Sequence, residues 1–374
     1  MFESLYAHLP GSVHRALERI GLVLARAAAG HLEKVAEFGG NPAGLGMKLY
    51  LPPRAPAPGG PLLVVLHGCG QDAAGFAAAA GWTALADRLG APLVLPEQSA
   101  RNNRSRCFNW FERQNIARDS GEATSIRQMV DHAADRCKCD RRRVFIAGLS
   151  AGGAMAAAML AAYPDVFAAG AVVAALPVGS ASNAHSAVAR MADAGVHLTA
   201  EDWAERARAL APPGYGGRWP RISIWHGLAD RVVDPANANN LLAQWATLHG
   251  LGGAPTLDLS PRAGVRRRVW RDGVEVWTIE GMAHGFPVAH ASTEPFVLSA
   301  GIDAGKSVVA FRSTDLDEML MMLKRCGMDF TVIEGFKTRH FQKIVIGDFC
   351  SQTAILCNPT VDQVISSLPG FEEY

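Results

Sequence analysis

The sequence predicts an α/β fold built on a doubly wound, mostly parallel sheet. Short apolar runs rich in β-branched residues, as found in strands buried on both faces, alternate along the chain with helical segments. Strands that alternate with helices form parallel sheets with right-handed crossovers. The chain has 374 residues, 49% of them hydrophobic and 19% charged, so it can bury a large core without disulfides or a structural metal.

The expected elements follow one another at regular intervals. The expected strands cover residues 47–51, 62–66, 92–96, 143–147, 168–174, 221–225 and 274–279, and the expected helices cover 73–89, 122–136 and 154–163. Residues 178–219 interrupt this order with helical sequence between glycines and prolines. We expect this insertion to cap the carboxyl ends of the strands, where such sheets place their sites.

Charge and hydropathy argue against several classes of function. The 36 basic and 35 acidic residues give a net charge of +1, so nothing attracts the chain to nucleic acid or an anionic membrane. No apolar run approaches the ~18 residues of a membrane-spanning helix. Two of the seven cysteines, Cys137 and Cys139, form C-x-C without the second pair of a zinc site. Residues 1–30 lack the apolar core of a secretory signal and are expected to form an amphipathic surface helix.

The segment GLSAG at residues 148–152 carries the first catalytic candidate. It has the G-x-S-x-G pattern and lies between an expected strand and an expected helix. In this context the glycines allow a sharp turn that lifts the serine hydroxyl above the sheet, and the following helix directs its first amides to the same point. We therefore expect Ser150 to be a nucleophile. The alternative is an ordinary turn serine.

A nucleophilic serine needs a base, and the base needs an orienting acid. In the α/β-hydrolase fold these residues occur in the order serine, acid, histidine, each after a strand. The last two expected strands lead into Asp230 and His284, which we expect to be the acid and the base. Asp234 and His290 are the alternatives. The proline after Asp234 marks that aspartate as a helix cap instead.

The segment HGCGQ at residues 67–71 follows the strand expected at 62–66. An H-G-x-x stretch at this place supplies a backbone amide to the oxyanion hole. We expect the backbone N–H groups of Cys69 and Ala151 to form that hole. His67 is expected to brace the loop, with a catalytic role as the alternative. The chemistry needs no metal and no organic cofactor.

Several longer motifs stand in order along the chain: LLVVLHGCGQ, AGWTALADRLG, PEQS, RCFNWF, GEATSIRQMV, GLSAGGAMAAAMLAAYPDVFAAGAVVA, ISIWHGLADRVV and GMAHGFPV. Together they resemble the polyhydroxybutyrate (PHB)-depolymerase-type esterases over about residues 37–303. The resemblance implies an α/β-hydrolase that cleaves short-chain polyhydroxyalkanoates or related esters through Ser150, Asp230 and His284. Relatives also act on acetylated or feruloylated polysaccharides, so the ester itself stays open.

The resemblance implies three further features. Cys107 is the expected partner of Cys69 in a disulfide that holds the oxyanion loop. Phe108, Trp110 and Trp225 lie in motif segments and are expected to line an apolar acyl-binding crevice, with ordinary core positions as the alternative. Most relatives are secreted, which suits a disulfide. The first thirty residues show no convincing export signal, so a cytoplasmic location is the alternative.

The end of the chain differs in composition from the rest. Residues 1–300 contain three lysines, whereas residues 301–374 contain four lysines and only three alanines. The stretches STDLDE and VIEGFK resemble the C-terminal portion of molybdopterin-guanine dinucleotide biosynthesis protein B, a P-loop nucleotide-binding accessory protein. Gly305-Lys306-Ser307 is not a P-loop, because the required first glycine is Ala300. We expect an α/β fragment whose apolar surface favours self-association.

Three segments are therefore expected. They are an N-terminal helical segment at 1–36, an esterase domain at 37–303 with a cap at about 178–219, and an unrelated fragment at 304–374. The expected function is a serine hydrolase that cleaves carboxylic esters through an acyl-enzyme. The alternatives are a polysaccharide acetyl or feruloyl esterase, a serine peptidase or acyltransferase on the same fold, and a molybdenum-cofactor accessory module acting through the tail. The oligomeric state stays open.

Overall fold

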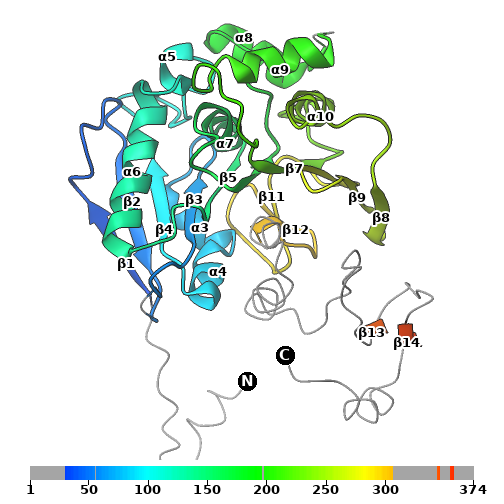
Figure 1. Cartoon of the computed structure of the whole chain (residues 1–374), viewed down its shortest axis with the longest axis horizontal. Helices are drawn as coiled ribbons and strands as arrows, with labels where there is room; N and C mark the ends of the chain where they lie inside the picture. The colour runs from blue at the N-terminus through cyan, green and yellow to red at the C-terminus, as the bar shows by residue number, and fades with distance from the viewer. Residues whose placement is uncertain (1–29, 55, 196–197, 306–342, 346–353, 358–374) are drawn as a thin grey trace, which may run out of the picture.

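Ten strands form the central sheet of the protein (Figure 1). The computed structural model describes residues 30–54, 56–195, 198–305, 343–345 and 354–357. The strands lie in the order β1-β2-β4-β3-β5-β6-β7-β10-β9-β8. Their bounds are β1 His31–Val35, β2 Gly46–Leu51, β3 Leu62–Leu66, β4 Leu93–Glu97, β5 Val144–Leu149, β6 Ala169–Val173, β7 Arg221–Gly227, β8 Leu257–Arg262, β9 Val265–Trp270 and β10 Val274–Ile279.

The six central strands, from β4 to β10, are all parallel, whereas β1, β2, β9 and β8 pair antiparallel at the two edges. The central strands β3, β5 and β6 are each buried along their whole length, as expected for a sheet covered on both faces. With helices on both faces, this is the mostly parallel sheet of the α/β-hydrolase fold, as the sequence predicted.

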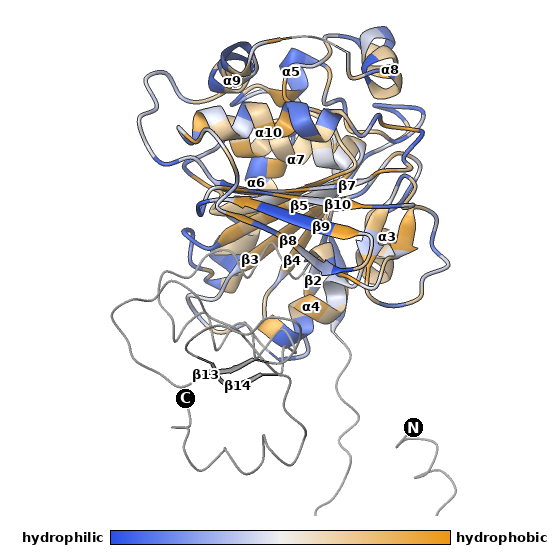
Figure 2. Cartoon of the chain, turned by 90° about the vertical axis from the view of Figure 1, so that its right-hand side faces the viewer, coloured by the Kyte–Doolittle hydropathy of each residue, from blue (hydrophilic) through white to orange (hydrophobic). Residues whose placement is uncertain are grey.

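Helices cover both faces of this sheet (Figure 2). One face carries α6, α7 and α10, and the other carries α3 and α4. Their bounds are α3 Ala73–Ala79, α4 Trp82–Leu89, α6 Gly121–Cys137, α7 Ala151–Ala162 and α10 Asn237–Leu248. A two-stranded sheet of β11 Phe286–Val288 and β12 Val297–Ser299 packs on the α3 and α4 side, where Phe286 contacts Phe76 and Trp82.

The insertion at 178–219 contributes two helices to different places in the fold. It forms α8 Ala184–Ala192 and α9 Ala200–Arg208, which lie with α5 Arg113–Ile116 outside the layer of α6, α7 and α10 (Figure 2). α9 packs on α10 and α7. α9 therefore extends the helical layer. The end of α8 instead contacts the loop after β7, through the bonds from Asp234 N to Met191 O (2.8 Å) and from Ala194 N to Asp234 Oδ2 (3.0 Å).

Local differences from the expected elements have simple causes. The helix expected at 73–89 is two helices, because Gly81 adopts a left-handed backbone (φ 75°) between them. Residues 31–35, within the segment expected to be helical, form the edge strand β1. Its side chains are mostly exposed and polar, so it lacks the apolar run that marks a buried strand. Residues 1–29 and most of 304–374, with the features expected there, lie outside the described residues.

Candidate active site

Ser150 occupies the sharp turn between β5 and α7. Its backbone has φ 56° and ψ −120°, a conformation that costs a non-glycine residue on the order of 1–3 kcal/mol. Both flanking glycines are required by close contacts. A Cβ on Gly148 would lie 2.2 Å from Gly152 O, and a Cβ on Gly152 would lie 2.4 Å from His67 O. The G-x-S-x-G pattern is thus the sequence that this tight turn demands.

Asp230 and His284 meet because the strands before them are neighbours. β7 and β10 pair in parallel, with Gly227 opposite Ile279, so the loops that follow both strands leave the sheet side by side. The backbone N–H of Ala229 donates to Met282 O (3.0 Å), which joins the two loops. His284 Nδ1 then donates to Asp230 Oδ2 at 2.8 Å. In the neutral tautomer this bond requires, Nε2 carries no proton and can accept one.

The Asp230 carboxylate is held in its charged form by its neighbours. Its Oδ1 accepts the backbone N–H groups of Val232 (2.8 Å) and Val233 (2.9 Å). The buried His226 also places Nε2 3.2 Å from Oδ2. Burial by itself would raise the pKa of Asp230, but the hydrogen bonds from His226, His284 and Val233 hold that pKa well below its usual range. His226 is a member of this site that the sequence analysis did not single out.

The two alternatives proposed for the acid and the base lie elsewhere. Asp234 accepts the backbone N–H groups of Ala236 (2.9 Å) and Ala194 (3.0 Å), so it caps the chain before α10, as its proline suggested. His290 Nε2 donates to Ala79 O (2.8 Å) at the end of α3. Neither side chain takes part in the Asp230–His284 pair.

Ser150 and His284 are each 8% exposed. Among the hydrogen bonds of the described residues, none joins Ser150 Oγ to His284. In free hydrolases this contact is often long and tightens only around the substrate. The structure therefore brings Asp230 and His284 into contact and places Ser150 at its turn, two strands away from β7 in the sheet order.

The loop at residues 67–71, which we call the oxyanion loop, is held in its orientation by His67. Its Nε2 accepts the backbone N–H of Gln98 (3.2 Å), so the ring proton lies on Nδ1, which donates to Gly68 O (2.7 Å). In a trans peptide the N–H points away from the preceding carbonyl oxygen, so this bond also sets the direction of the Cys69 N–H. Burial lowers the pKa of His67 and keeps the ring neutral. With both ring nitrogens occupied, His67 braces the loop and is not available as a base.

Within the part of the chain that the structure describes, the backbone N–H groups of Cys69, in the oxyanion loop, and of Ala151, at the start of α7, donate to no acceptor. A disulfide joins Cys69 to Cys107 and so ties the oxyanion loop to the loop that precedes α5. Free N–H donors on a braced loop and at a helix start are what an oxyanion hole requires.

The three aromatic residues expected to line a crevice are core residues. Phe108 is fully buried and packs against His67, with ring centroids 5.0 Å apart. Trp225 is fully buried and stacks on Trp277 at 4.4 Å. Trp110 is 6% exposed and packs against a neighbouring ring. Their rings fill space behind the loops, which was the alternative given for them.

Different apolar side chains are exposed beside the catalytic candidates. Leu228 and Val232 flank Asp230 and are 50% and 44% exposed. Phe296, which is 44% exposed, packs edge-on against His284 with ring centroids 5.8 Å apart. Phe296 also has a left-handed backbone (φ 63°), which is rare for an aromatic residue. The sequence analysis did not single out Phe296, which lies in the loop just before β12.

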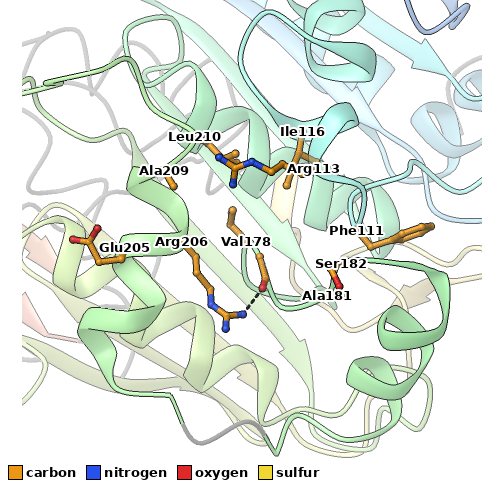
Figure 3. A pocket seen from close by; sticks show the side chains of 11 residues that line it. Phe111, Arg113, Ile116, Val178, Ala181, Ser182, Glu205, Arg206, Ala209 and Leu210 are labelled. Atoms are coloured by element: carbon orange, nitrogen blue, oxygen red, sulfur yellow. Dashed lines mark hydrogen bonds between the residues drawn. The ribbon is translucent and has the colours of Figure 1, made fainter.

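A cavity of about 510 Å³ lies apart from these residues (Figure 3). Its walls come from α5, from the loop at 178–182 and from α9, and none of the catalytic candidates lines it. Arg206 closes one side by donating a hydrogen bond to Gly179 O. Within the described ranges, no three His, Cys, Asp or Glu side chains gather as metal ligands, and no helix is long and apolar enough to cross a membrane.

Comparison with known proteins decides the family. A family model described as esterase PHB depolymerase matches residues 45–269. The chain belongs to this family. This PHB-depolymerase-family chain is 43% identical over 263 residues to poly(3-hydroxyalkanoate) depolymerase C of Paucimonas lemoignei, covering 69% of this chain and 62% of that one. It thus spans less than two thirds of that relative's length.

Two esterases are also similar to this PHB-depolymerase-family chain. The acetylxylan esterase of Coprinopsis cinerea is 35% identical over 266 residues, covering 69% of this chain and 70% of the relative. The structure of the acetyl xylan esterase from Aspergillus awamori matches with a TM-score of 0.63 and 28% identity, covering 68% and 94%. The predicted α/β-hydrolase fold and the predicted membership of the PHB-depolymerase-type esterase family are confirmed.

Proposed function

We propose that this chain hydrolyses carboxylic esters by two-step acyl transfer, with Ser150 as nucleophile, His284 as base and Asp230 as acid. The observation that carries the proposal is the 2.8 Å hydrogen bond between Asp230 and His284, together with the strained turn that presents Ser150. The charged Asp230 keeps the proton of His284 on Nδ1 and stabilises the imidazolium that forms when Nε2 accepts a proton.

In the first step, Ser150 Oγ attacks the ester carbonyl carbon while His284 Nε2 takes the hydroxyl proton. The carbonyl oxygen becomes an oxyanion that accepts the N–H groups of Cys69 and Ala151. Collapse of this intermediate breaks the ester C–O bond, and His284 returns the proton to the departing alcohol. Water then attacks the acyl-enzyme with His284 as base, which releases the acid and restores Ser150.

The substrate that we propose is a short-chain polyhydroxyalkanoate or its oligomers. This choice is supported by the name of the relative at 43% identity and by the exposed apolar side chains of Leu228, Val232 and Phe296 beside the Asp230–His284 pair. Binding of an alkyl-bearing polyester is favoured when its apolar groups cover such surface and remove it from water. The alternative substrate is an acetylated or feruloylated polysaccharide, which the acetylxylan esterase relative favours.

A panel of esters tests both parts of this proposal. We expect hydrolysis of hydroxybutyrate oligomers and of short-chain nitrophenyl esters, and loss of at least about 10³-fold in kcat for Ser150→Ala. Ester hydrolysis that survives Ser150→Ala would refute the nucleophile. A strong preference for acetylated xylan over hydroxybutyrate oligomers would refute the substrate and leave the mechanism intact.

A further inference from the structure

A buried carboxylate outside the proposed triad lies behind the oxyanion loop. Glu122 stands in the first turn of α6 and is 1% exposed. Its Oε1 accepts the side-chain amides of Gln98 (2.6 Å) and Asn109 (2.7 Å), and its Oε2 accepts the backbone N–H of Asn109 (2.9 Å). Burial raises the pKa of Glu122 to about 7. Burying a carboxyl group away from water costs free energy, and the three hydrogen-bond donors around Glu122 offset that cost. The question is what this buried group does in the fold.

One path from Glu122 leads to the proposed oxyanion amide through Gln98. The Gln98 side chain donates to Glu122, and the Gln98 backbone N–H donates to His67 Nε2. His67 Nδ1 in turn donates to Gly68 O, the carbonyl of the peptide that carries the Cys69 N–H. Three successive hydrogen bonds thus link the carboxylate to the direction of that amide.

A second path leads to the same residue through the disulfide. Asn109, which gives Glu122 two hydrogen bonds, lies two residues after Cys107. The side chain of Asn103 donates to Asn109 Oδ1 (2.9 Å) and accepts the backbone N–H of Cys107 (3.3 Å). Cys107 is bonded to Cys69. Glu122 is therefore the point where both supports of Cys69 meet.

We infer that Glu122 is a positioning residue that fixes the Cys69 N–H on the developing oxyanion, acting through His67 and through the disulfide-bonded loop. This inference rests on the proposed function. Glu122 touches no reacting atom, so its effect falls on the transition state, where the oxyanion exists, and not on substrate binding. Its removal should lower kcat and leave KM nearly unchanged.

The test compares Glu122→Gln with a matched control, Glu275→Gln. Glu275 in β10 is also a fully buried carboxylate, which accepts from Ser223 of β7 (2.5 Å) and from Arg267 (3.0 Å). In Glu122→Gln, an amide NH₂ replaces one carboxylate oxygen, so a donor faces the N–H donors of Gln98 or Asn109. For each variant, kcat on nitrophenyl butyrate is measured per active site, counted by covalent labelling of Ser150 with a fluorophosphonate, so that unfolded protein does not enter.

We expect kcat per labelled site to fall about tenfold in Glu122→Gln, less than the loss of a whole oxyanion donor, with KM within about twofold. Inhibition by an alkyl trifluoromethyl ketone, which forms a tetrahedral oxyanion on Ser150, should weaken by the same factor. In Glu275→Gln the unfolding temperature should fall, while kcat per labelled site and inhibition stay at the wild-type values.

Equal kcat per labelled site in Glu122→Gln and wild type would overturn the inference, as would an equal loss in both variants. Should Glu122→Gln not fold, Gln98→Met removes one of the three hydrogen bonds. It is expected to show a smaller loss of the same kind, and an unchanged kcat would again overturn the inference. Failure of the proposed function is separate, because wild-type protein would then hydrolyse no ester or Ser150→Ala would keep the activity.

Discussion

Gly152 shows how a single residue without a side chain determines the geometry of the proposed nucleophile. A Cβ at this position would lie only 2.4 Å from the carbonyl oxygens of both Leu66 and His67. These carbonyls belong to the end of β3 and the start of the oxyanion loop. The turn at Ser150 and the oxyanion loop are therefore packed directly on each other.

We expect Gly152→Ala to destabilise the protein by about 1–3 kcal/mol, because the new methyl group overpacks rigid backbone. Ester hydrolysis should fall at the same time, since the clash displaces either Ser150 or the oxyanion loop. Denaturant unfolding and kcat measure the two effects. Gly252→Ala is the control, because no atom lies within 4 Å of its Cβ position. A Gly152→Ala variant as stable and active as this control would contradict the packing argument.

Phe296 is the residue that we expect to set acyl preference. The Phe296→Ala variant should lose about tenfold in kcat/KM on a hydroxybutyrate trimer relative to nitrophenyl acetate, since only the longer ester reaches the exposed ring. Leu32→Ala, a substitution of an apolar side chain 41% exposed on the edge strand β1, should leave that ratio unchanged. If Phe296 only supported His284, both esters would lose the same factor.

Glu122 also makes stability depend on pH. Its pKa is about 7 in the folded chain and 4.5 as an ordinary carboxyl, so the folded state binds this proton more tightly. Protonation of Glu122 therefore adds to the free energy of unfolding in full below pH 4.5, and this contribution is lost as the pH rises through about 7. The unfolding free energy of wild type relative to Glu122→Gln should be about 2 kcal/mol larger at pH 5 than at pH 8. A difference that does not change between these pH values would contradict this.

At the scale of elements, the disulfide closes a loop between the segments after β3 and β4. Cys69 and Cys107 lie 38 residues apart, and constraining a loop of this size contributes about 2–4 kcal/mol. We expect Cys107→Ser to lose stability in this range and to lower kcat, because the oxyanion loop loses one support. Cys137→Ser, at a cysteine that forms no disulfide, is the control for stability and kcat. An unchanged kcat in Cys107→Ser would show that the bond only stabilises.

The elements also show what the sequence could and could not reveal. β3 was predicted at its observed bounds, because a strand covered on both faces carries an unbroken apolar run. β10 was also predicted at its observed bounds, from its β-branched and aromatic residues. Edge strands such as β1 and β8 expose most of their side chains, so they carry no such signal. The pairing of Asp230 with His284 followed from order along the chain. Glu122 and Phe296 could not be predicted, because their roles depend on contacts between distant segments. His226 contacts Asp230 within its own loop, but only the folded loop shows that contact.

At the scale of the whole molecule, every residue proposed for catalysis lies between 67 and 284. The described core ends near Ala304, which is fully buried against the α3 and α4 side of the sheet. We therefore expect a chain that ends after Gly305 to keep ester hydrolysis within about twofold of the full chain, since it keeps every residue of the described core. Melting temperature and kcat of both chains measure this. A large loss in the shortened chain would assign the last residues a role in the esterase.

The exposed apolar side chains beside the site belong to loops, whereas the groups proposed for the chemistry are held by buried hydrogen bonds and packed strand ends. Substitutions at Leu228, Val232 or Phe296 therefore cost little core packing, and they leave Ser150 and the Asp230–His284 pair in place. The ester that this chain accepts can therefore be altered through exposed loops, without rebuilding the buried framework that holds the proposed reaction centre.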